Sequence, residues 1–128
     1  TTGEGVLMTL KERKKIAEEW IKYQEKDFRV IIHIGTSSSR QSQELAKHAQ
    51  KKGLKIAPHG CQELQLPLVA AVSNGELLEY YPPEVDELRK ELFHPKLKID
   101  SDGYVTVPDS PGIGFDLNMD LLNRFKVS

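Results

Sequence analysis

The sequence predicts an α/β fold, and three observations support that prediction. Residues 28–57 read as strand, helix and strand with short connections, which is the order of a βαβ unit. Residues 97–100 and 104–107 flank the tight-turn sequence Ser101-Asp102-Gly103, which indicates a β-hairpin near the end of the chain. The 128 residues are 38% hydrophobic and 29% charged, which is typical of one globular domain.

The first element is expected to be a helix over residues 9–22. Thr9 and Glu12 have the spacing of a capping box, in which each side chain accepts a hydrogen bond from the other residue's backbone N–H. The apolar residues that repeat with helical spacing are Ile16, Ala17, Trp20 and Ile21. We therefore expect these four side chains to form the buried stripe of the helix.

A strand is expected over residues 28–34, because this segment is rich in β-branched residues and nearly continuous in apolar character. Such a run is typical of a parallel strand that is covered on both faces. Side chains alternate along a strand, so Val30, Ile32 and Ile34 should share one face while Ile31 and His33 share the other.

The second helix is expected over residues 40–52. Ser38 and Gln41 have the spacing of another capping box, and Gly53 is suited to the position after the last turn. The expected buried stripe consists of Leu45, Ala46 and Ala49. A short strand at 54–57 follows at once, and it should lie parallel to the first strand to complete the βαβ unit.

Beyond this unit, residues 64–72 form an apolar helical stretch interrupted by Pro67. Because proline lacks an N–H, it fits best in the first turn of a helix, and we expect Pro67 there. Residues 77–81 then read as a strand that ends at Pro82-Pro83.

Charge and composition exclude several classes of partner. Eighteen Lys and Arg residues stand against 19 Asp and Glu, so a net charge of -1 predicts no attraction to nucleic acid or an anionic membrane. No apolar run approaches the roughly 20 residues of a membrane span. Cys61 is the single cysteine, so no internal disulfide is expected and a cytoplasmic location is the default expectation.

The N-terminal part of the chain resembles the N-acetylneuraminate lyase and dihydrodipicolinate synthase family of class I aldolases. The segments that carry this resemblance are Thr1-Thr2-Gly3-Glu4-Gly5, residues 12–20, Val30-Ile31-Ile32-His33-Ile34-Gly35 and residues 42–49. The resemblance implies that Thr2 contacts the carboxylate of a 2-keto acid and that Thr1 joins a proton relay. The alternative is that both threonines belong to a frayed terminus without a role.

From Gly53 onward the chain resembles the C-terminal part of sugar-acid dehydratases and mandelate racemases of the enolase superfamily. The segments concerned are Ile56-Ala57-Pro58-His59-Gly60, residues 62–64, 68–71, 77–82, 103–109 and 111–114. The resemblance implies that the eighth barrel strand ends near His59, and that Glu63 lies beside the substrate carboxylate as a catalytic acid. The alternatives are an ordinary acidic residue at a helix start for Glu63 and a loop-end histidine for His59.

Together, the two resemblances imply a partial (β/α)8 (TIM) barrel with βαβ units, followed by a C-terminal β-hairpin segment. Residues 1–52 would form the aldolase-like segment, and residues 53–128 the enolase-superfamily-like segment. Neither catalytic set is complete. None of Lys47, Lys51, Lys52 and Lys55 matches the aldolase Schiff-base motif, and the strands that carry the Mg²⁺-binding carboxylates of the enolase superfamily have no counterpart. We therefore expect no metal site and no cofactor in this chain, although the enolase-superfamily relatives use Mg²⁺.

Three functions remain open at this stage. The chain is a lyase remnant that needs further strands for activity, a non-catalytic α/β protein that oligomerises, or a module that binds a small carboxylate or sugar acid. A partial barrel leaves strand edges and an apolar face open, so we expect a homo-oligomer. The candidate site residues are Glu63 for catalysis and Thr1, Thr2 and His59 for substrate binding.

Overall fold

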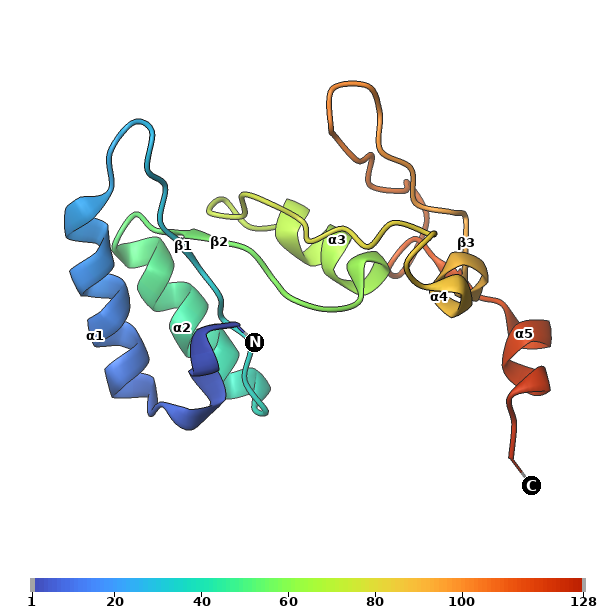
Figure 1. Cartoon of the computed structure of the whole chain (residues 1–128), viewed down its shortest axis with the longest axis horizontal. Helices are drawn as coiled ribbons and strands as arrows, with labels where there is room; N and C mark the ends of the chain where they lie inside the picture. Colours follow the sequence, from blue (N-terminus) through green and yellow to red (C-terminus); the bar gives the residue numbers. More distant parts are fainter. Residues whose placement is uncertain (1, 128) are drawn as a thin grey trace.

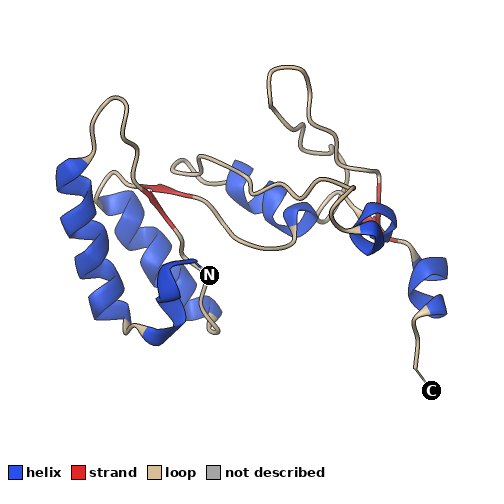
Figure 2. Ribbon diagram, viewed as in Figure 1, coloured by secondary structure: helices blue, strands red, loops and turns tan. Residues whose placement is uncertain are grey.

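The computed structural model describes residues 2–127, and it has the mixed α/β character that the sequence predicts. The chain consists of helices, two-residue strands and the loops that join them (Figures 1 and 2). The elements in order are η1 (Thr2–Leu7), α1 (Leu10–Trp20), η2 (Ile21–Tyr23), β1 (Ile31–Ile32), α2 (Ser39–Lys51), β2 (Lys55–Ile56), α3 (Gln62–Ala70), α4 (Glu87–Leu92), β3 (Phe93–His94), β4 (Asp116–Leu117) and α5 (Met119–Arg124).

The βαβ unit is confirmed. β1 pairs in parallel with β2, with Ile31 opposite Lys55 and Ile32 opposite Ile56, and α2 forms the connection between them. β1 is shorter than the strand expected over residues 28–34. Only Ile31 and Ile32 of that segment pair with β2. A single parallel bridge between Ile56 and Gly75 adds a further backbone segment beside β2.

The N-terminal lobe, residues 2–57, has its own core beneath this small sheet. Leu54 is completely buried there, and it is clustered with Ala17, Val30, Ala49 and Ile56. The partly buried side chains packed against this cluster are Ile21, Ile32, Ile34 and Ala46. The expected face of the first strand, with Val30 turned to the same side as two isoleucines, is thus confirmed.

In α1 the expected apolar stripe is wrong at two positions. Ala17 is buried, and Ile21 packs on the core at the end of the helix. In contrast, Ile16 is 42% exposed and Trp20 is 50% exposed. The ring of Trp20 instead lies against Tyr23 and Phe28 at the surface. The helix therefore meets the core along a stripe narrower than its apolar residues suggest.

One expected capping box is present and the other is not. The Thr9 side chain accepts the Glu12 N–H, and the Glu12 carboxylate accepts the Thr9 N–H at 2.8 Å, which confirms the first box. Ser38 is the N-cap of α2, but its side chain makes no capping bond, so the second box is wrong. The Thr36 hydroxyl accepts the Ser38 N–H at 3.0 Å instead.

The segment after β2 departs from expectation in two places. α3 begins at Gln62 rather than near Leu64, which puts Pro67 in the helix interior and not in the first turn. Residues 77–81 are extended but form no strand, because their backbone finds no ladder partner among the described residues. The Tyr81 N–H donates to the Gln62 side chain at 2.7 Å, so a side chain takes the place of a neighbouring strand.

The C-terminal lobe, residues 61–127, packs around Leu66, Phe93 and Phe115. β3 and β4 pair antiparallel next to α4, and α5 follows them (Figure 1). The expected hairpin is present as one antiparallel bridge between Ile99 and Val105. No helix in residues 2–127 is long and apolar enough to cross a membrane.

Candidate functional site

Titratable side chains meet at the carboxyl ends of the parallel strands. His33 directly follows β1, His59 follows β2, and Glu79 follows the segment that bridges to β2 at Gly75. His59 Nδ1 lies 2.7 Å from Glu79 Oε2, and the His33 ring stands edge-on to the His59 ring with centroids 6.0 Å apart. We call His33, His59, Glu79 and Tyr81 the acid–base cluster.

Glu79 is the acceptor at the centre of the acid–base cluster. Its carboxylate accepts hydrogen bonds from the Gly60 N–H at 3.1 Å and from the Tyr81 hydroxyl, in addition to its contact with His59. Desolvation acts to raise the pKa of Glu79, but the hydrogen bonds and the charge of His59 outweigh it, and the pKa lies below its usual value. The bond to Glu79 also raises the pKa of Tyr81. Glu79 is therefore held as a carboxylate, and its contact with Nδ1 orients the imidazole of His59.

His33 has a different electrostatic role. Burial lowers its pKa first, and the charges of Arg13 and His59 lower it further. Arg13 donates to the backbone carbonyl of His33 at 2.8 Å and to that of Gly35 at 2.9 Å, which fixes the chain after β1. The Nδ1 atom of His33 is buried and has no hydrogen-bond partner among the described residues. His33 thus supplies a neutral imidazole beside the His59–Glu79 pair.

Gly35 makes room for the His33 ring. A Cβ at this position would lie 2.6 Å from atoms of the imidazole, which is closer than carbon atoms approach one another. A larger residue at position 35 would therefore displace the His33 ring from its place beside His59.

Glu63 lies in the first turn of α3, and it is 4% exposed. Its carboxylate accepts from Gln62 Nε2 at 3.1 Å, with the Cys61 thiol 3.5 Å away. It lines a hollow of about 610 Å³ in the C-terminal lobe, and neither His59 nor Glu79 lines that hollow. Although Glu63 and His59 are neighbours in sequence, the structure does not bring them into one site.

The two expected N-terminal ligands cannot be placed. Thr1 and the side chain of Thr2 lie outside the described residues. The adjoining Gly5 is buried against the guanidinium of Arg13. A small hollow of about 120 Å³ beside η1 is lined by Gly5, Arg13 and Thr36 among others, and it contains neither Glu63 nor His59.

Sequence reasoning missed Glu79, His33 and Tyr81 as members of a site. The signal was available for two of them. His33 stands at the end of an expected strand just before Gly35, and Glu79 lies within the expected strand at 77–81. Polar residues that follow or interrupt apolar parallel strands tend to gather at one edge of a sheet, where ligands bind.

The Mg²⁺ site implied by the enolase-superfamily resemblance is not matched by the residues present. Such a site needs several oxygen ligands around one ion. Over residues 2–127 no group of three or more His, Cys, Asp and Glu side chains is placed to hold a metal ion. The cluster has one carboxylate, Glu79, and it is already engaged by His59 and Tyr81.

Comparison with known proteins supports both resemblances. The family model described as "Enolase C-terminal domain-like" matches residues 16–121. N-acetylneuraminate lyase of Homo sapiens is 50% identical over 54 residues, which are 41% of this chain and 17% of that protein. The Xenopus tropicalis lyase is 48% identical over 86 residues, 66% of this chain and 27% of that protein. N-acetylneuraminate lyase A of Xenopus laevis is 27% identical over 133 residues, 93% of this chain and 42% of that protein.

The chain therefore spans 17% to 42% of the length of these three curated relatives. No solved structure matches it. The fold and the acid–base cluster define an α/β protein with titratable side chains at the carboxyl ends of parallel strands. Because the family model covers most of its residues, the chain belongs to the enolase C-terminal domain-like family.

Proposed function

We propose that the chain is a partial (β/α)8 barrel derived from lyases that act on sugar acids and 2-keto acids, and that it retains a site for a small carboxylate. Residues 1–52 are the aldolase-like segment and residues 53–128 the enolase-superfamily-like segment. The observation that carries the proposal is the 2.7 Å contact of His59 with Glu79 at the carboxyl ends of the parallel strands. Active sites of (β/α)8 barrels lie at that end of the strands.

The chemistry of the His59–Glu79 pair suits a carboxylate ligand. With Nδ1 directed to Glu79, the Nε2 atom of His59 is the one left for a ligand. A protonated Nε2 donates to a ligand carboxylate, and a neutral Nε2 accepts a proton. This geometry supports the proposed substrate-binding role of His59. By the aldolase resemblance, Thr2 would contact the ligand carboxylate and Thr1 would join a proton relay, and we include both in the proposed ligand set.

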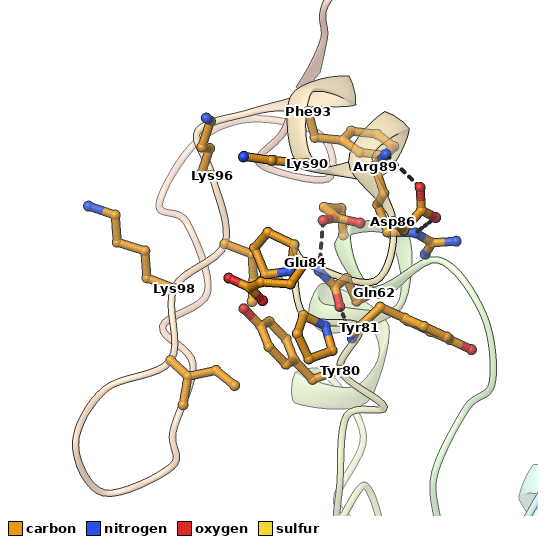
Figure 3. Close-up of a pocket in the computed structure, with 15 residues that line it drawn as sticks. Gln62, Tyr80, Tyr81, Glu84, Asp86, Arg89, Lys90, Phe93, Lys96 and Lys98 are labelled. Carbon is orange, nitrogen blue, oxygen red and sulfur yellow. Dashed lines mark hydrogen bonds and ion pairs between the residues drawn. The ribbon is translucent and has the colours of Figure 1, made fainter.

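The enolase-superfamily resemblance implies that Glu63 is a catalytic acid, and we propose it in that role in the larger hollow (Figure 3), apart from the His59–Glu79 pair. Its burial and its place on the wall of the larger hollow support a carboxyl that meets a ligand in the C-terminal lobe. The alternative, an acidic residue that merely favours the start of α3, is compatible with its position in the first turn.

We further propose that the isolated chain does not turn over substrate. Cleavage of a carbon–carbon bond or removal of a proton beside a carboxylate needs a barrier reduction of roughly 8 kcal/mol or more. One acid–base group supplies about 10²- to 10⁴-fold, or roughly 3 to 5 kcal/mol. Glu63 or His59 alone would therefore supply only part of the required barrier reduction. In the two families that the chain resembles, a metal ion or an iminium lysine is expected to supply the rest.

Two assays on the purified chain test this proposal. In the first, aldonic acids are incubated in D₂O with and without Mg²⁺, and exchange of the α-proton is followed by NMR. In the second, pyruvate or N-acetylneuraminate is added with borohydride, and the protein mass is measured. We expect binding of the acids, weakened by His59→Gln, without exchange or lysine adduct. Turnover that Glu63→Gln abolishes would contradict the claim of inactivity.

Self-association is part of the proposal, because the α3 face away from the C-terminal core is apolar and uncovered. Leu64 is 42% exposed and Leu68 is 61% exposed, and their spacing of four residues puts them on one side of α3. Val72, which lies just beyond the end of the helix, is 40% exposed. Proteins seldom leave such a stripe open to water. Sedimentation velocity at micromolar concentration should show a homo-oligomer, which Leu68→Glu should dissociate. A folded monomer at that concentration would contradict the proposal.

A further inference from the structure

The side of α1 that faces away from the core carries large apolar side chains. α1 lies at the outer edge of the N-terminal lobe and packs against α2 with its other side (Figure 1). Ile16 is 42% exposed and Trp20 is 50% exposed, and their spacing of four residues puts them on one side of the helix. Tyr23, in the turn that follows, is 65% exposed. We call these three residues and Phe28 the outer face of α1.

The rings of the outer face pack on one another. Trp20 stands edge-on to Tyr23 with ring centroids 6.4 Å apart, and the Phe28 ring lies 6.2 Å from that of Trp20. Rings held in this way lose little further freedom when a partner covers them, because an aromatic side chain has only two rotatable bonds. Aromatic side chains of this kind are enriched at the centres of protein–protein interfaces. The outer face therefore has the composition of an interface.

The charged residues beside the outer face alternate in sign. Glu12, Lys15, Glu19 and Lys22 follow one another at spacings of three and four residues, so they line one edge of the helix. In an antiparallel copy of α1 this order is reversed, and each charge then meets its opposite. Lys15 comes beside Glu19 of the second copy, and Glu12 comes beside Lys22. Two parallel helices would instead bring like charges together.

Lys15 has the charge and the freedom for such a contact. It is exposed, and no ion pair joins it to another side chain within residues 2–127. Glu19 pairs with Lys22 at 2.7 Å on the surface, and both side chains are more than half exposed. A second cation can therefore reach the Glu19 carboxylate from outside the chain.

We propose that two copies of this chain associate through the outer face of α1, with the two helices antiparallel about a two-fold axis. Ile16 of one copy then lies against Trp20 of the other, and symmetry repeats the contact. Lys15 joins the Glu19–Lys22 pair of the second copy into a charge network beside the rings. This surface is separate from the apolar stripe on α3 and from the His59–Glu79 pair. Two isologous contacts on one chain build an assembly larger than a dimer.

The Leu68→Glu variant is the background for the test, because it removes the α3 contact and leaves α1 unchanged. Sedimentation velocity from about 1 to 100 µM should show this variant passing from monomer to dimer. Trp20 is the single tryptophan of the chain, so its fluorescence should shift to shorter wavelength over the same concentrations as the second copy covers the ring. Association through another surface would leave the emission constant.

Exchange of charges tests the antiparallel orientation in the same background. Lys15→Glu should weaken the dimer roughly tenfold, because symmetry places the new carboxylate beside Glu19 twice. Adding Glu19→Lys to Lys15→Glu should restore the affinity, since opposite charges meet again. Lys47→Glu, the same change of charge at an exposed position of α2, should leave the dimer unchanged. Circular dichroism of each variant checks that its helix content is retained.

A Leu68→Glu variant that stays monomeric up to about 100 µM, with constant Trp20 emission, would overturn the proposal. Equal effects of Lys15→Glu and Lys47→Glu, or no recovery when Glu19→Lys is added, would overturn it as well. Failure of the α3 contact has a different result. In that case the unmodified chain is itself the α1 dimer, and Leu68→Glu leaves its affinity unchanged. His59→Gln should not alter the association in either case.

Discussion

Truncation of Leu54 to alanine should strongly lower the free energy of unfolding of the protein. Leu54 is 0% exposed, and Ala17 and Ala49 are buried in the same cluster. Leu→Ala changes in cores cost about 2–5 kcal/mol, more where the cavity cannot collapse. Alanine side chains are too short to move into the space, so we expect Leu54→Ala to cost about 3–5 kcal/mol. Single domains are stable by only about 5–15 kcal/mol, so this is a large fraction of the total.

Urea unfolding followed by circular dichroism and by the fluorescence of Trp20 measures this loss. Trp20 lies in α1 and reports on the N-terminal lobe. The matched control is Leu7→Ala in η1, where the leucine is 79% exposed and the cost should stay at about 0.5 kcal/mol. A loss below about 1 kcal/mol for Leu54→Ala, or a loss equal to that of the control, would refute the assignment of the core.

Three further predictions follow from single contacts. Thr9→Ala should destabilise α1 by about 1 kcal/mol and speed hydrogen exchange of its first turn, whereas Ser38→Ala should not do so in α2 because Ser38 makes no capping bond. The pKa of His33 is lowered by burial, so its contribution to stability is complete above pH 6.5 and lost as the pH falls from there through the folded pKa; in urea titrations His33→Gln should flatten this part of the pH profile. The pKa of Glu79 is lowered despite desolvation, by its hydrogen bonds, so its contribution is present above pH 4.5 and lost below; Glu79→Gln should flatten that acid limb.

The βαβ unit could be predicted because its signals are local and agree with one another. α2 has a buried stripe at Leu45 and Ala49 and a glycine with a positive φ of 70° just after its end. The strands on both sides are β-branched and apolar, and the connections are short. When propensity, periodicity and stop signals point to the same element, the element forms where the sequence puts it.

Residues 77–81 do not form the strand that was expected, and the reason lies in their hydrogen bonding. A strand exists only when a neighbouring backbone completes its ladder, and residue patterns do not state whether that neighbour is present. Here the Gln62 amide takes the Tyr81 N–H, and the contact of this segment with β2 stops at the bridge from Gly75. Gln62 is also the first residue of α3, so the helix begins earlier than expected and Pro67 lies in its interior.

The candidate site residues His59 and Glu63 are close in sequence, but their side chains face different parts of the structure. His59 and Glu63 are four positions apart, but a turn and the start of α3 lie between them. His59 turns toward Glu79 and the strands, while Glu63 turns into the larger hollow. The long-range partner of His59 is a residue twenty positions away, and only the folded chain identifies it.

The acid–base cluster joins the two proposed segments of the chain, and this makes the strand register decisive for function. In the proposed division, His33 would lie in the aldolase-like segment, and His59 and Glu79 in the enolase-superfamily-like segment. Their side chains meet because Ile31 pairs with Lys55 and Ile32 with Ile56. A slip of one residue between β1 and β2 would turn His33 to the opposite face, away from His59. The parallel pairing of β1 with β2 thus also places the His33 imidazole beside the His59–Glu79 pair.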